Sequence, residues 1–87
     1  MNFTIVHEVP GRIRISVGGK MPESHACAME ERLLALPAVY TCVAYPKAGS
    51  LAVTFNRTKQ GRLAVLNELD MLDPATLTKV NQREMLV

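Results

Sequence analysis

The sequence contains few aromatic residues, few cysteines and no long apolar run. Only 5% of its 87 residues are aromatic although 48% are hydrophobic, so the core has to be built from Leu, Val, Ile, Ala and Met. Two cysteines, Cys27 and Cys42, provide no disulfide framework, which favours a reducing, cytoplasmic setting. No apolar stretch reaches the roughly 18 to 20 residues of a membrane-spanning helix. Residues 1–9 also lack the pattern of a signal peptide.

Net charge is low as well. The formal charge is +2 at pH 7, which gives no general case for a nucleic-acid or anionic-membrane partner. A chain of 87 residues is long enough for one modest core but too short for two. We expect one domain over residues 1–80, and residues 81–87 as the start of a linker or a truncated tail.

Residues 36–56 carry the clearest structural signal. Residues 39–45 and 51–55 are rich in β-branched and aromatic side chains, and the short loop between them holds Pro46 and Gly49. This pattern predicts a β-hairpin. One face of the hairpin is apolar, provided that its first strand is kinked near the start. This face has to be buried against another element of the chain.

Helices are predicted on both sides of the hairpin. The first begins near Pro22, a residue suited to a helix start, and ends at Pro37. The second begins with Asn56 or Thr58 as cap, and Gly61 in its first turn costs about 1 kcal/mol relative to alanine. Apolar stripes at spacings of three and four comprise Ala26, Met29, Leu33 and Leu36 in the first helix, and Val65, Leu66, Leu69 and Leu72 in the second.

Two further strands complete the predicted sheet. Residues 2–7 and 12–17 read as one long strand with a bulge or bend at Pro10 and Gly11. Residues 76–80 read as a short edge strand. The order strand, helix, strand, strand, helix, strand predicts an α+β, ferredoxin-like βαββαβ sandwich, with a four-stranded antiparallel sheet and two helices on one face.

Several motifs in this layout resemble a known family. LPAV at the end of the first helix, the AGS turn and the strand LAVTFN resemble heavy-metal-associated domains, which occur at the cytosolic N-termini of heavy-metal P-type ATPases and in copper chaperones. The opening VHEVPGRIRISV resembles a divergent branch in which such pumps start with a histidine, a PGR turn and a basic strand. The matching parts cover about residues 6–72.

This resemblance implies a regulatory or docking domain on the cytoplasmic side of a cation pump. Its partners would be the other domains of the ATPase or a metal chaperone, and the pump's catalytic groups would lie beyond residue 87. A stand-alone metal chaperone and a protein-interaction domain of the same fold are the alternatives. The chain itself shows no phosphate-binding loop and no nucleophile with a base, so we expect no enzymatic activity from it.

The sequence departs from the family at the metal site. Typical members hold a soft ion between two cysteines just before the first helix, but the family's spacing places these positions at Pro22 and His25. The two-thiolate site is therefore absent. A substitute copper(I) or zinc(II) site would have to use Met21, His25 and Cys27. Only Met21 and His25 stand at i and i+4, because His25 and Cys27 project about 160° apart on a helix.

Basic residues gather around the predicted bend. Arg12 and Arg14 share one strand face because they are two residues apart, and His7 lies on the other side of the bend. These three residues are candidates for a patch that binds anions or docks a partner. The simpler interpretation is a soluble outer face that discourages pairing between sheet edges. RNA binding through stacked aromatics fits poorly, because so few aromatic residues are present.

Overall fold

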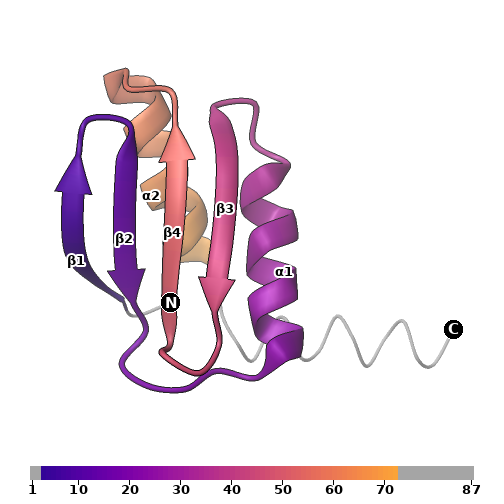
Figure 1. Cartoon of the computed structure of the whole chain (residues 1–87). Coiled ribbons are helices and arrows are strands. Elements are labelled where there is room, and N and C mark those ends of the chain that lie inside the picture. The colour runs from indigo at the N-terminus through magenta and orange to yellow at the C-terminus, as the bar shows by residue number, and fades with distance from the viewer. Residues whose placement is uncertain (1–2, 73–87) are drawn as a thin grey trace, which may run out of the picture.

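A computed structural model describes residues 3–72 as four strands and two helices (Figure 1). In chain order they are β1 (Thr4–Val9), β2 (Arg12–Ser16), α1 (Glu23–Leu34), β3 (Val39–Tyr45), β4 (Ser50–Phe55) and α2 (Lys59–Met71). The strands form one antiparallel sheet in the order β1-β2-β4-β3. The predicted α+β class and four-stranded antiparallel sheet are confirmed, and the arrangement is consistent with a ferredoxin-like sandwich.

The helices cover one apolar face of this sheet. Figure 1 shows α2 behind the strands and α1 alongside β3. Alternate residues of β2 and β4 are buried, namely Ile13, Ile15, Leu51, Val53 and Phe55. The same hydrophobic core contains Ala26, Met29 and Leu33 of α1 and Val65 and Leu69 of α2. Because residues of both helices share one core with the same strand face, the predicted apolar stripes are confirmed for these residues. The first helix is shorter than predicted, because α1 ends at Leu34, and Leu36 lies beyond it and is only partly buried against the core.

The prediction of one long first strand is wrong, because the chain reverses at Pro10 and Gly11. Val9 pairs with Arg12, so the two residues between them form a tight turn between β1 and β2. Gly11 has φ +84°, and proline at the preceding position has a φ fixed near −65°. This combination suits a type II turn. β1 consequently lies at the edge of the sheet, next to β2. In the predicted ferredoxin-like order, this edge position belongs to the strand that follows the second helix.

The register of β1 shifts before this turn. Ile5 pairs with Ile15, whereas His7 pairs with Arg14 and Glu8 with Ile13, so a bulge lies between Ile5 and His7. Glu8 therefore lies on the helix side of the sheet, where its partner Ile13 is buried, and His7 lies on the opposite side.

The loop between β2 and α1 is tied to the turn between β3 and β4. The Val17 N–H donates to the Gly49 carbonyl oxygen at 2.8 Å, and the Met21 N–H donates to the Pro46 carbonyl oxygen at 2.9 Å. Gly49 has φ +65°, and a Cβ there would lie 1.7 Å from the carbonyl oxygen of Gly19. This close approach requires glycine and fixes the path along which the chain enters α1.

Both helices start where the sequence predicts. Pro22 is the N-cap of α1, and Thr58 is the N-cap of α2, where its hydroxyl accepts a hydrogen bond of 3.1 Å from the Gly61 N–H. The predicted kink in the first strand of the hairpin is also confirmed, because the register of β3 shifts between Val39 and Thr41.

Some predictions fall on residues that the structure does not describe. They are the strand at residues 76–80 and the domain end at residue 80. Within residues 3–72, no helix is both long and apolar enough to cross a membrane.

Candidate functional site

The residues predicted as metal ligands have different environments at the start of α1. The Met21 side chain is only 9% exposed and belongs to the hydrophobic core, and its N–H is bonded to the carbonyl of Pro46. His25 is half-buried in the first turn of α1, and Cys27 is exposed. Because His25 and Cys27 both lie within the helix, their side chains project about 160° apart.

Their assignment as copper(I) or zinc(II) ligands stays a prediction. Within the described part of the chain, no group of three or more His, Cys, Asp or Glu side chains is placed to hold a metal ion. Use of Met21 as a ligand would also require its thioether to leave the core, and removing a methionine from a core costs about 2–5 kcal/mol. The geometry therefore gives little support to a three-residue site.

Cys42 belongs to the core, as predicted. It is 5% exposed, and burial raises the pKa of its thiol from 9.0 to about 12, with a further contribution from the Glu30 carboxylate. A metal ligand or nucleophile has to be a thiolate. Cys42 stays protonated at neutral pH and is suited to packing.

The three predicted patch residues lie together on the sheet face opposite the helices. His7 and Arg14 are a cross-strand pair, and Arg12 is two residues from Arg14 on the same strand. In Figure 1, no described helix covers this face. We call it the open face and define it by His7 and Val9 of β1, Arg12 and Arg14 of β2, and Val43 and Tyr45 of β3.

The open face has a single sign of charge. Glu8 is the only acidic residue in the four described strands, and its side chain is on the helix side. All other carboxylate side chains among residues 3–72 lie on α1 or α2, namely Glu23, Glu30, Glu31, Glu68 and Asp70. Among residues 3–72, the cations of the open face therefore have no carboxylate partner on their own face.

Exposed apolar surface adjoins these cations. Val43 is 46% exposed and Tyr45 is 45% exposed. The guanidinium of Arg14 lies over the ring of Tyr45, 5.6 Å from its centroid, which is within range for a cation–π interaction. Nearby, the hydroxyl groups of Thr41 and Thr54 are hydrogen-bonded to each other across β3 and β4.

Sequence reasoning identified the arginines but missed Tyr45. Its position could have been found from the sequence, because side chains alternate between the two faces of a strand. Cys42 and Ala44 share the inner face, so Tyr45 belongs to the outer face. Its contact with Arg14 could not be predicted, because β4 lies between the strands of the two residues.

Comparison with models of known protein families finds no match, and a search of curated proteins finds none either.

Proposed function

We propose that this chain is a docking domain of the heavy-metal-associated type, serving on the cytoplasmic side of a heavy-metal P-type ATPase. It lacks the two-cysteine metal site and binds an acidic surface of the pump body or of a metal chaperone through its open face. The observation that carries this proposal is the charge pattern of that face, where Arg12, Arg14 and His7 adjoin exposed Val43 and Tyr45 and the described strands place no carboxylate.

The surface chemistry supports a weak and reversible contact. An exposed ion pair contributes about 0.2–1 kcal/mol and is screened by salt. Two arginines with one aromatic side chain can therefore give specificity and a fast association rate more readily than high affinity. Such a contact suits a domain that has to associate with a pump and be released from it repeatedly.

The start of α1 supports docking over metal transfer. Pro22 replaces one thiolate position of the family, His25 replaces the other, and the neighbouring Met21 is buried. Transfer of a soft ion between two thiolates needs groups that this loop does not contain.

An acidic protein surface fits the open face better than single-stranded RNA does. RNA-binding sheets stack bases on several aromatic side chains of the central strands. The two central strands here, β2 and β4, present no aromatic residue on the open face, because Phe55 is buried among the core residues. Tyr45 lies on an edge strand and is covered in part by Arg14.

An NMR titration tests the docking proposal. We would add a glutamate-rich peptide to the isotopically labelled chain and expect saturable shifts at residues of the open face. The variant Arg12→Glu with Arg14→Glu should bind about tenfold more weakly, since it turns attraction into repulsion. The control, Lys20→Glu with Arg32→Glu, has the same net charge but changes exposed residues outside the open face. Equal affinities of the two variants would overturn the proposal, as would tighter binding of an oligouridine RNA than of the peptide.

The family assignment has its own test. The coding sequence that follows residue 87 should contain several apolar spans and an Asp-Lys-Thr-Gly-Thr stretch if the domain belongs to such a pump. A stop codon at that point, together with docking through the open face, would favour a stand-alone interaction domain.

A further inference from the structure

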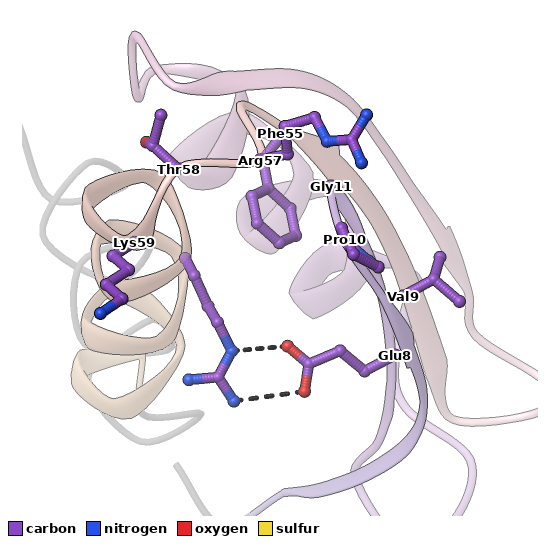
Figure 2. A pocket seen from close by; sticks show the side chains of 9 residues that line it. Glu8, Val9, Pro10, Gly11, Phe55, Arg57, Thr58 and Lys59 are labelled. Carbon is purple, nitrogen blue, oxygen red and sulfur yellow. Dashed lines mark hydrogen bonds and ion pairs between the residues drawn. The ribbon is translucent and has the colours of Figure 1, made fainter.

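A hollow of about 300 Å³ lies between the β1–β2 turn and the start of α2 (Figure 2). Pro10 and Phe55 form apolar walls, and four charged residues surround them, namely Glu8, Arg57, Lys59 and Arg62. The hollow is on the helix side of the sheet, where Glu8 points, and Val9 is the one residue that it shares with the open face as defined above. Ligand pockets range from about 300 to 1,000 Å³, so this one accepts a small molecule or one side chain rather than a nucleotide.

Two interactions hold the walls of the hollow together. The Phe55 N–H donates to the Gly11 carbonyl oxygen at 2.9 Å, which fixes the β1–β2 turn against the end of β4. Across the hollow, Nε of Arg62 donates to Glu8 at 2.5 Å and its NH2 group donates to the second carboxylate oxygen at 3.2 Å. Figure 2 shows Glu8 below the ring of Phe55, with dashed lines marking these two bonds. A preformed shape of this kind lowers the entropy cost of binding.

The α2 side of the hollow is fixed by local caps. The Thr58 N–H donates to Oδ1 of Asn56 at 3.2 Å, and the Thr58 hydroxyl accepts from the Gly61 N–H. These bonds set the backbone positions of Arg57 and Lys59 on either side of Thr58. The first turn of α2 also brings the positive end of the helix dipole to this side.

Positive charge exceeds negative charge around the hollow. Both oxygens of Glu8 are already bound by Arg62, and the same interaction lowers the pKa of Glu8, so this carboxylate is ionised at neutral pH and satisfied. Arg57 and Lys59 are exposed and have no ion-pair partner among residues 3–72. Both residues line the hollow, but in Figure 2 their side chains extend away from it in opposite directions. Their rotatable bonds allow them to turn towards a bound anion.

We infer that this hollow binds a carboxylate joined to a small apolar group. The apolar group lies against Pro10 and Phe55, and the carboxylate is held at the rim by Arg57 and Lys59. The largely apolar walls favour a singly charged carboxylate over inorganic phosphate. Phosphate is more strongly hydrated and has no apolar group whose burial could offset the cost of desolvation. Such a carboxylate is carried by a free organic acid or by the C-terminus of a peptide that ends in an apolar residue.

The test is an NMR titration with three probes, namely 3-phenylpropanoate, a tetrapeptide ending in leucine with a free C-terminus, and the same peptide amidated, and with inorganic phosphate for comparison. We expect saturable shifts at Gly11, Phe55 and Lys59. Binding of the free acid alone identifies an organic acid, and preference for the free over the amidated peptide identifies a protein tail; both support the inference. Failure of all three probes to saturate, or inorganic phosphate binding as tightly as the carboxylates, would overturn it.

Variants separate this site from non-specific attraction. Arg57→Gln with Lys59→Gln should weaken binding about tenfold, whereas Lys20→Gln with Lys47→Gln removes equal charge from exposed positions elsewhere and should leave it unchanged. Unchanged affinity in Arg57→Gln with Lys59→Gln would contradict the inference. The Arg12→Glu and Arg14→Glu variant should bind the probes normally, so failure here and failure of the docking proposal are distinguishable.

Discussion

Gly61 and Asn56 are in such close contact that a Cβ on Gly61 would lie 2.3 Å from the carbonyl oxygen of Asn56. The contact joins the first turn of α2 to the end of β4, and it sets the distance between the helix and the strand that form one side of the hollow. Helix propensity alone favours alanine over glycine here by about 1 kcal/mol. The contact reverses that preference.

We therefore predict that Gly61→Ala destabilises the domain by about 1–3 kcal/mol, the usual cost of overpacking. Urea unfolding followed by circular dichroism measures this change. Gly19→Ala is the matched control, because a Cβ at Gly19 would have no heavy atom within 4 Å and its φ is not positive. The control should be neutral or slightly stabilising. A more stable Gly61→Ala protein would show that the contact relaxes without cost.

Local patterns were sufficient for most of the fold. The β3–β4 hairpin, its kink and both helical stripes follow from side-chain periodicity within single segments, which does not depend on distant partners. The β1–β2 hairpin was missed because Pro10 and Gly11 fit a bulge within one strand as well as a reversal between two. Only the pairing of Val9 with Arg12 decides between them, and a sequence does not show pairing.

The sites show the same division between local and distant information. Arg12 and Arg14 were recognisable as one surface because their spacing fixes a common face. The pair of Glu8 with Arg62 joins residues 54 positions apart in the sequence, and no local pattern indicates it. The hollow beside this pair could not be predicted for the same reason.

The two cysteines should react very differently. Cys27 is exposed, whereas Cys42 is buried and the pKa of its thiol is raised to about 12, so almost no Cys42 thiolate exists at pH 8. We predict that iodoacetamide modifies one thiol per folded chain and a second only after denaturation, as counted by mass spectrometry. Cys27→Ser should leave the folded chain unmodified. Modification of folded Cys27→Ser would mean that Cys42 becomes accessible through local opening.

The same thiol makes stability depend on pH in the alkaline range. The folded chain keeps the Cys42 proton up to about pH 12, whereas the unfolded chain loses it above the ordinary pKa of 9.0. The contribution of the protonated Cys42 thiol to the free energy of unfolding is therefore complete below pH 9.0 and is lost as the pH rises towards 12. The loss is up to about 1.4 kcal/mol per pH unit. Urea unfolding of the wild type and of Cys42→Ala at increasing pH measures this slope. A parallel decline in both proteins would assign it to other groups.

The Glu8–Arg62 pair should respond to acid. The hydrogen bonds from Arg62 lower the pKa of Glu8 below 4.5. A lowered carboxyl pKa stabilises the folded chain above the ordinary value, and this contribution disappears as the pH falls through the folded value. We predict that the Glu8 side-chain carbon signal titrates at lower pH in the wild type than in Arg62→Met, which keeps the length of the side chain but not its charge. Coincident titrations would mean that the pair does not persist in solution.

Metal titration tests whether the loop before α1 has lost metal binding. Met21 is packed in the core and Cys27 projects away from His25, so we predict that copper(I) and zinc(II) bind the reduced chain only weakly and without fixed stoichiometry. Competition against a chromogenic chelator measures this uptake. Cys27→Ser should remove most of it, whereas Met21→Leu with His25→Ala, in which leucine preserves the core volume, should leave it intact. Tight binding of one ion that is abolished in Met21→Leu with His25→Ala would establish the substitute site and argue for a metal-carrying role in place of docking alone.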